Sequence, residues 1–510
     1  MRTKNSIRNI VVSLTGQMIA IMLSFISRKV FIMSMTETLL GVNSVFTNLL
    51  SMLSLAELGI GTAITFSLYQ PLAEADEKTI QAIMRFYKQI YRIIALVVAG
   101  LGACIVPFFP YIIKETVPNL YLYYALYLSS TIISYLCSYK RTIIIADQKS
   151  YISSICRNIY LVLLNAIQII VLIVSQNYAW YLAVQIILSF LENIVVSKIA
   201  DKMYPYMNEG KHTLSKEKKK KIYKDIQALM MHRIGSVVVT NTDSILLSAI
   251  VNIQAVAVYA NYKLVISGIN TLLAQAYASF TASVGNLLVD KDRKYGYGVY
   301  QTLQMITYWI YGVISICLFV LFNDLIKIWV GSSFRESSFY VFVLVFNFFI
   351  IGVREPTNIF KNACGLFRND RYKAIFESII NIILSLVLGI KFGAIGIFGA
   401  TICSCLLVPY WIEPYVLYKN YWKIPLRKYF IYSLRQILNL LFIGVIIKGV
   451  THFWVVNGWL MLLGKSCMVF ILTNLLFILL NINTKELKLV VHKIQSICKR
   501  RDKKEIKRRK

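Results

Sequence analysis

The amino-acid sequence predicts an all-α, polytopic membrane protein. Hydrophobic residues make up 57% of the 510 positions, and the mean hydropathy is +0.62. Apolar runs of about 20 residues, the length that crosses a bilayer, recur along the chain. The formal net charge of +31 would suggest a nucleic-acid partner in a soluble protein, but here the Lys and Arg residues lie between the apolar runs. We therefore expect contact with a lipid bilayer and with no nucleic acid.

Length and hydropathy predict about fourteen transmembrane helices. Their expected positions are 8–32, 39–68, 90–113, 120–138, 156–175, 180–199, 233–252, 256–287, 301–322, 339–361, 375–391, 393–417, 430–449 and 458–480.

Charge predicts the orientation of these helices. Most of the 55 Lys and Arg residues fall in the termini and in alternate loops. The opposite loops contain few cations, namely Lys114, Lys327, Arg335, Lys391 and Lys448. Because cytoplasmic loops carry the excess of Lys and Arg, both termini are expected in the cytoplasm. The composition favours a multi-pass membrane protein.

The longest loop divides the chain. We expect an N-terminal six-helix bundle in residues 1–201, a cytoplasmic amphipathic connector in 202–232, and a C-terminal six-helix bundle in 233–418. Two further helices follow in 419–480, and a basic cytoplasmic tail occupies 481–510. The basic turns that begin at Ser138 and at Asn362 occupy corresponding places in the two bundles, which predicts a pseudo-repeat.

The connector has a helical pattern of its own. Ile222, Ile226, Leu229 and Met230 share one face, and Lys219, Lys220 and Lys224 lie opposite. This pattern is typical of a helix on the anionic inner leaflet. A solvated connector whose charges set the topology explains it equally well.

Catalytic and metal-binding patterns are not found in the sequence. The four His residues lie in loops or at the ends of expected helices, without an HExxH motif or a Cys/His cluster. We therefore expect no catalytic residues, no metal site and no cofactor, and a protein that is not an enzyme.

Ionisable residues at membrane depth indicate where such a protein works. The candidates for substrate binding are Arg28, Glu57, Asp243, Lys263 and Arg354. A short carboxylate at mid-depth cannot reach the interface and must face a partner or water. For Arg354, a role in local packing explains its position as well as substrate binding does. A cavity that holds cations and a few carboxylates suits an anionic headgroup, because the planar guanidinium of Arg matches phosphate oxygens.

Two other cations have a simpler interpretation. The long side chains of Lys29 and Lys465 are expected to extend to the outer interface.

Four stretches resemble the polysaccharide repeat-unit flippases of the multidrug/oligosaccharidyl-lipid/polysaccharide exporter superfamily. They are LGVNSVFTNLLSMLSLAELGIGTAI from Leu40, TNTDSILLS from Thr240, VYANYKLV from Val258 and NACGLFRNDRYKAIFESIINIILS from Asn362. The resemblance covers most of residues 5–430.

The resemblance implies transfer of an undecaprenyl-pyrophosphate-linked oligosaccharide from the inner to the outer leaflet of a bacterial inner, or plasma, membrane by alternating access. The product would enter a capsule, O-antigen or exopolysaccharide, with a polysaccharide polymerase as a further partner. Lipid II flippases of this superfamily carry several cavity arginines. The smaller number here, with Glu57 and Lys263 present, disfavours a peptidoglycan precursor.

Two alternatives remain open. A cation-coupled multidrug antiporter of the same architecture could use Glu57 and Asp243, although a cationic drug gains nothing from Arg28 and Lys263. A membrane-embedded polysaccharide polymerase or ligase usually needs a large outer loop, and the longest one expected here, 323–338, is short.

Overall fold

The computed structural model describes residues 2–490 except 58, 209–211, 291 and 367–368. The described residues form helices and no strand, which confirms the predicted all-α class. All fourteen expected membrane segments fall on helical elements. Nine helices of the described part are long and apolar enough to cross a bilayer. The protein is therefore a multi-pass membrane protein.

The chain forms two compact units, which are described separately below. Unit 1 comprises residues 1–272 and 374–397, and unit 2 comprises residues 273–373 and 398–510. The predicted bundles, 1–201 and 233–418, and the tail, most of which (491–510) lies outside the described residues, remain predictions.

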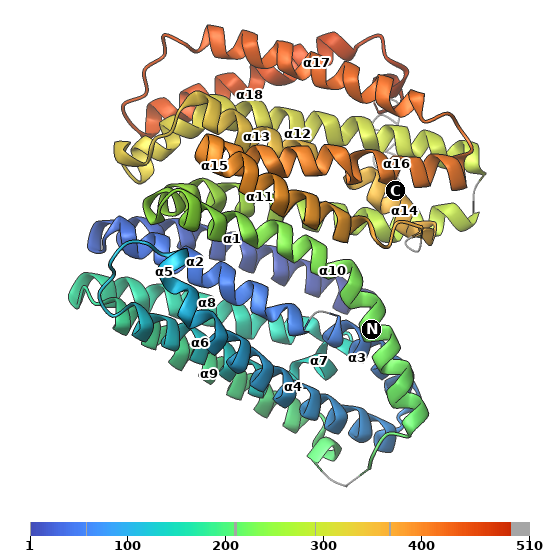
Figure 1. Cartoon of the computed structure of the whole chain (residues 1–510). Coiled ribbons are helices and arrows are strands. Elements are labelled where there is room, and N and C mark those ends of the chain that lie inside the picture. Colours follow the sequence, from blue (N-terminus) through green and yellow to red (C-terminus); the bar gives the residue numbers. More distant parts are fainter. Residues whose placement is uncertain (1, 58, 209–211, 291, 367–368, 491–510) are drawn as a thin grey trace, which may run out of the picture. The chain divides into compact units, whose positions relative to one another are not determined.

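Unit 1 consists of antiparallel helices, most of which come from the N-terminal half of the chain (Figure 1). In it, α1 packs against α8, α6 against α4 and α9, and α10 against α2 and α3. Its helices are α1 (Arg2–Ser34), α2 (Glu37–Leu53), η1 (Ser54–Glu57), α3 (Ile60–Glu74), α4 (Glu77–Ile105), η2 (Val106–Phe108), α5 (Phe109–Ile112), α6 (Leu120–Ser138), α7 (Arg141–Ala146), α8 (Ser150–Val174), α9 (Tyr178–Met203), η3 (Pro205–Asn208), α10 (Lys216–Ile250), the first part of α11 (Ile253–Asp290) and most of the first half of α15 (Lys373–Leu407).

Unit 2 is built around α12, which packs against α13, α14, α17 and α18. Its helices are the second part of α11, α12 (Arg293–Trp329), η4 (Ser332–Phe334), α13 (Ser338–Gly352), α14 (Glu355–Ala363), the last part of α15, α16 (Pro409–Leu417), the π-helical turn Tyr418–Trp422, α17 (Arg427–Val450) and α18 (Trp459–Asn481).

The second expected segment, 39–68, is a broken helix. It contains α2, the 3₁₀ turn η1 and α3 in succession. Gly59 immediately precedes α3 and has a φ of 83°, a left-handed conformation that glycine adopts without the steric penalty of a Cβ atom. Glu57 ends η1 and so lies at the break.

A sharp turn separates the eleventh and twelfth expected segments. Gly393 has a φ of 60° and a ψ of −138° inside α15. A Cβ atom at Gly396 would come 2.0 Å from the carbonyl oxygen of Leu388, so the two flanking helices approach closely at this point. The boundary expected between 391 and 393 is therefore a glycine turn.

The predicted connector continues directly into a membrane helix, because α10 runs unbroken from Lys216 to Ile250. Ile222 and Ile226 are buried, and the Tyr223 ring lies 5.5 Å from the Phe86 ring of α4. The chain itself thus covers this part of the apolar face. The side chain of Leu229 lies outside the described residues.

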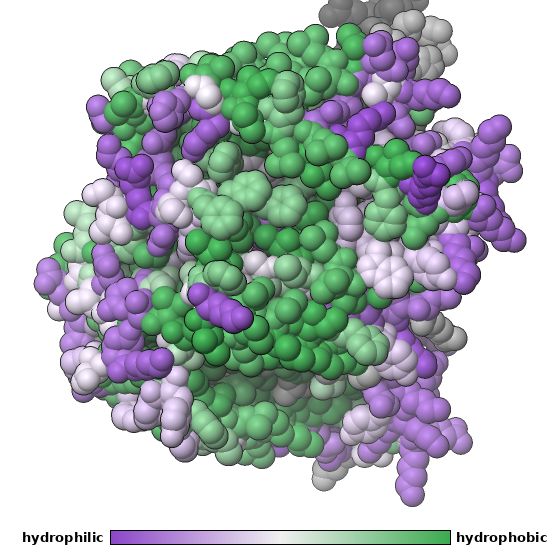
Figure 2. Space-filling model, turned by 45° about the horizontal axis from the view of Figure 1, so that its top comes forward, coloured by the Kyte–Doolittle hydropathy of each residue, from purple (hydrophilic) through white to green (hydrophobic). Residues whose placement is uncertain are grey.

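Many large apolar side chains lie on the surface of both units. Leu96, Ile390 and Leu460 are 74%, 75% and 84% exposed. Figure 2 shows broad apolar surface along the helices, with hydrophilic residues gathered toward their ends. Leaving one such side chain in water instead of burying it costs roughly 1.5–3 kcal/mol. This surface is therefore stable in lipid, as the sequence predicts.

Candidate functional site

Three helices of unit 1 bring Lys263 and Asp243 together. The Lys263 ammonium of α11 donates to Asn48 Oδ1 of α2 and to the Thr240 carbonyl of α10, each at 3.2 Å. Asp243, 5% exposed, lies close enough to attract this ammonium. The carboxylate therefore has a cation beside it, as a charge inside a membrane protein requires.

Arg28 occupies a different place in unit 1, among aromatic residues. Tyr127 of α6 and Tyr178 and Tyr181 of α9 lie close enough to interact electrostatically with the guanidinium. Tyr178 donates to Asn43 Oδ1 at 3.0 Å, and Tyr127 donates to the same oxygen. These bonds hold two of the three phenols in place.

The guanidinium of Arg28 is incompletely paired. Its Nη1 is buried and has no hydrogen-bond partner among the described residues. Within the same part of the chain, no carboxylate forms an ion pair with it. A buried N–H without a partner costs about 1–3 kcal/mol, so an acceptor oxygen at this position would stabilise the guanidinium.

Glu57 lies in a third polar group, a pocket inside unit 1 with a volume of about 570 Å³. The Tyr91 hydroxyl donates to Glu57, Tyr87 donates to Tyr91 at 3.0 Å, and Thr142 donates to Tyr87 at 3.2 Å. This chain of hydroxyls connects the break in the second segment to α7.

The same pocket holds an ion-pair cluster. Arg141 Nη2 lies 2.6 Å from Glu192 Oε1, and Arg157 Nη1 lies 3.5 Å from Glu192 Oε2. Two guanidiniums and two carboxylates thus line the pocket, and their formal charges cancel.

Arg354 belongs to unit 2 and to an ion-pair network. Its Nε and Nη2 donate to the two oxygens of Glu413 at 3.0 and 2.7 Å, the paired geometry that favours Arg with carboxylate. Glu413 is fully buried and also pairs with Lys373. Asp370 joins Lys373 at 3.4 Å and pairs with Lys361. This arrangement agrees with the local-packing role that the sequence offers for Arg354 as one of two alternatives.

The structure thus places the five candidates in four groups. Lys263 and Asp243 lie together, Arg28 lies among tyrosines, Glu57 lines the pocket of unit 1, and Arg354 is paired in unit 2. The substrate-binding role of each remains a prediction.

Sequence reasoning missed two buried carboxylates. Glu192 and Glu413 lie inside the expected segments 180–199 and 393–417. The rule that selected Glu57, an acidic residue at membrane depth, would also have selected them.

Lys465 extends toward residues of the expected outer loops, but its side chain ends in a buried ion pair and is not exposed at the interface. This lysine is buried and pairs with Asp324 at 2.8 Å, and it also donates to the Trp454 carbonyl at 3.3 Å. Asp324 lies near the end of α12, so the ion pair holds the ammonium inside unit 2.

Solved structures with a similar fold are all-α transporters. The lipid II flippase MurJ in an inward closed conformation has a TM-score of 0.64 and 16% identity, covering 92% of this chain and 98% of the flippase. An inward-facing multidrug resistance MATE family transporter of the MOP superfamily has a TM-score of 0.55 and 13% identity, covering 78% of this chain and 96% of the transporter. A mutant of the Vibrio cholerae MATE transporter VcmN has a TM-score of 0.53 and 12% identity, covering 83% of this chain and 99% of the transporter.

The chain has the fold of these transporters. No protein-family model matches it, and no curated protein matches it. At 12–16% identity the comparison concerns the fold alone. The fold is shared by a flippase and by multidrug transporters, so the substrate must be argued from the residues of this chain.

Proposed function

We propose that the protein is a flippase that moves an undecaprenyl-pyrophosphate-linked oligosaccharide from the inner to the outer leaflet of a bacterial plasma membrane. The product serves the biosynthesis of a surface polysaccharide, such as a capsule, O-antigen or exopolysaccharide, and passes to a polymerase on the outer side. Both termini lie in the cytoplasm. Transport proceeds by alternating access, which the fold of the similar transporters supports.

The observation that carries this proposal is the incompletely paired guanidinium of Arg28. A cation at membrane depth is energetically unfavourable unless it contacts a ligand, water or a buried counter-ion. Arg28 keeps a buried donor unpaired, and no carboxylate of the described residues neutralises it. A phosphate oxygen supplies both the missing acceptor and the missing negative charge.

The partner groups of Lys263 add to this argument. Lys263 donates to two neutral oxygens and lies beside the single carboxylate of Asp243. Substrate-binding roles for Lys263, Asp243 and Glu57 complete the proposal, with Lys263 as the second cation.

A cation-coupled multidrug antiporter is the second candidate, and the acidic residues of unit 1 favour it. Glu57 lines a pocket large enough for a small ligand. Two features count against it: Lys263 lies beside Asp243, and Arg141 and Arg157 share the pocket with Glu57. A cationic drug would meet these cations at each acidic position.

The proposal is tested by export of the repeat unit in Arg28 variants at matched membrane expression. Loss of one charge-assisted hydrogen bond costs about 1.5–3 kcal/mol, or roughly 10- to 150-fold in affinity. Arg28→Ala is therefore expected to abolish export, and Arg28→Lys to restore part of it. Lys29→Ala, one residue along α1, is the matched control and should export normally.

The antiporter gives a different pattern. Normal polysaccharide export by Arg28→Ala, together with drug sensitivity in Glu57→Gln cells, would replace the flippase proposal with the second candidate.

A further inference from the structure

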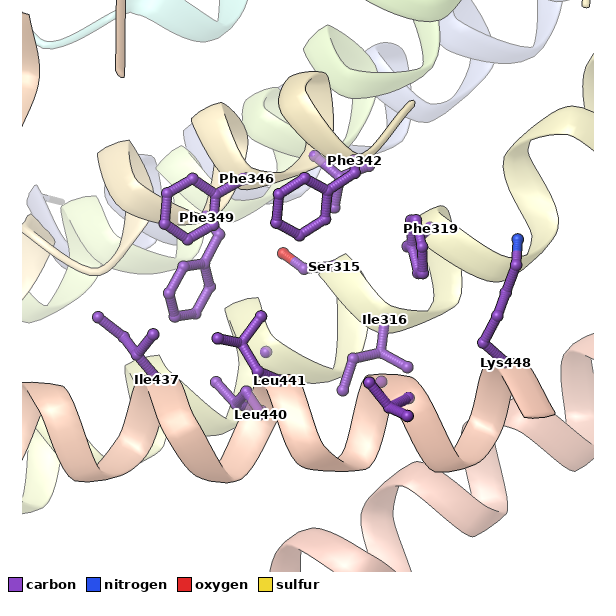
Figure 3. A pocket seen from close by; sticks show the side chains of 14 residues that line it. Ser315, Ile316, Phe319, Phe342, Phe346, Phe349, Ile437, Leu440, Leu441 and Lys448 are labelled. Carbon is purple, nitrogen blue, oxygen red and sulfur yellow. The ribbon is translucent and has the colours of Figure 1, made fainter. Parts of the chain in front are cut away.

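Unit 2 contains an apolar pocket that none of the candidate residues lines. It lies between α12, α13 and α17 and has a volume of about 310 Å³. Figure 3 shows Phe342, Phe346 and Phe349 on one side and Leu440 and Leu441 on the other. Ser315 and Lys448 are the two described lining residues with polar side chains.

The pocket reaches the surface of unit 2 along α17. Leu441 and Val445 line it and are 42% and 73% exposed. Because this surface is stable in lipid, the groups that meet the pocket are hydrocarbon chains.

A positive charge marks one end of the pocket. Lys448 lies at this end in Figure 3, and its ammonium lies 4.8 Å from the centre of the Phe319 ring. Lys448 has no ion-pair partner among the described residues. The neighbouring carboxylate, Asp324, is already paired with Lys465 at 2.8 Å. Two lysines and one carboxylate leave a net positive charge beside the apolar space.

We propose that this pocket is a binding site for an anionic phospholipid. One acyl chain lies between the phenylalanines of α13 and the leucines of α17, and the phosphate lies on Lys448. The membrane orientation predicted from the distribution of Lys and Arg among the loops places Lys448 at the outer end of α17. The bound lipid therefore belongs to the outer leaflet. The proposal is independent of the transported substrate.

The charge favours an anionic headgroup over a zwitterionic one. A phosphatidylcholine headgroup brings its own cation to a site that already has excess positive charge. Phosphatidylglycerol brings a phosphate without such a cation. A pyrophosphate headgroup is less suited, because Lys448 is a single point charge without the paired donors that a pyrophosphate engages.

Photolabelling of the full-length protein tests the proposal. The protein is reconstituted in nanodiscs of phosphatidylcholine with a small fraction of phosphatidylglycerol that carries a diazirine on one acyl chain. The same probe on phosphatidylcholine is the comparison. Labelled peptides are identified by mass spectrometry. We expect the anionic probe to label α13 and α17 around Phe346 and Leu441 more strongly than the zwitterionic probe.

Two variants separate the charge from the apolar space. One Lys near a membrane surface contributes about 1 kcal/mol, so Lys448→Gln should lower labelling by the anionic probe roughly fivefold. Gly444→Leu should block the pocket, because its added Cβ meets only Ile316 Cγ1 at 4.0 Å and the larger side chain then occupies the space. Gly449→Leu is the control on the same helix, since a Cβ there meets nothing within 4 Å and Gly449 does not line the pocket. Lys391→Gln is the control for loss of an exposed cation.

Thermal unfolding of each variant in the same nanodiscs shows whether it is folded. Equal labelling by the two probes in the wild type would overturn the proposal, as would unchanged labelling in folded Lys448→Gln and Gly444→Leu. Displacement of the probe by a polyprenyl phosphate, at a concentration where unlabelled phosphatidylglycerol has no effect, would assign the pocket to a different lipid and also overturn it.

Discussion

Two buried carboxylates, Glu192 and Glu413, are held by basic groups that precede or begin a helix. Glu192 of α9 pairs with Arg141 at the start of α7. Glu413 of α16 pairs with Arg354, just before α14, and with Lys373 at the start of α15. Removing one member of such a pair leaves the other charge buried and uncompensated.

Glu413→Gln should lower the free energy of unfolding by about 3–5 kcal/mol, because Arg354 and Lys373 lose their shared counter-charge. Thermal unfolding in detergent measures the change. Glu74→Gln is the control, since Glu74 is exposed and accepts a hydrogen bond from Gln70. Equal melting temperatures for the two variants would show that the Glu413 network does not stabilise unit 2.

The pair of Asp243 and Lys263 can be tested by a double-mutant cycle. Asp243→Asn and Lys263→Gln should each reduce stability, and the double variant should lose less than the sum, with a coupling energy of about 0.5–3 kcal/mol. The measurement is unfolding of all four proteins in detergent. Additive effects would mean that the two charges do not interact.

At the scale of elements, the break in the second expected segment positions Glu57. In a continuous α-helix, the directions of successive side chains follow one regular helical repeat. The 3₁₀ turn η1 and Gly59 interrupt this repeat next to Glu57. Broken membrane helices are common at the binding sites of transporters.

Gly59→Ala should destabilise unit 1 by about 1–2 kcal/mol, because a Cβ atom is unfavourable at a φ of 83°. Gly61→Ala is the control two residues later, where a Cβ would meet Tyr87 Oη at 3.4 Å, an ordinary contact. The same thermal measurement compares the two. A larger loss for Gly61→Ala would contradict the role assigned to the break.

The ion pairs also bear on the predicted repeat. In both halves a carboxylate on the expected sixth or twelfth segment pairs with a basic residue that lies in the junction before the expected fifth or eleventh segment. These pairs are Arg141 with Glu192 and Lys373 with Glu413. The corresponding places of the two pairs support a repeat that the sequence shows only as two basic turns.

At the scale of the whole molecule, apolar length and charge predicted the class well. The expected segments coincide with helices because a run of about 20 apolar residues has few stable alternatives in a bilayer. Breaks were harder to predict. The hydropathy along the sequence reveals neither the interruption at Gly59 nor the fact that α10 continues unbroken through Lys216–Ile250.

The candidate residues were predicted less completely, for a physical reason. Depth in the membrane can be read from position along a segment, whereas the direction of a side chain depends on which helices pack beside it. Arg28 and Lys263 could therefore be named as candidates, but the tyrosines near one and Asn48 beside the other could not be predicted. Lys465 was assigned to the interface because its partner, Asp324, lies far away in the sequence.

The predicted orientation can be tested by cysteine labelling in intact cells. The charge distribution places Lys219 in the cytoplasm and Lys391 outside. A membrane-impermeant maleimide should therefore label Lys391→Cys and should label Lys219→Cys only after the membrane is opened. The nine native cysteines must first be replaced. Labelling of Lys219→Cys from outside would reverse the topology.

The flippase proposal is tested most directly by the sidedness of the lipid-linked oligosaccharide. In cells that lack this protein, a membrane-impermeant glycan-modifying enzyme should find the undecaprenyl-pyrophosphate-linked repeat unit confined to the inner leaflet. Wild-type protein should restore its appearance outside, and Arg28→Ala at equal expression should not. Normal outer-leaflet oligosaccharide in cells without the protein, and without another transporter of the same substrate, would contradict the account.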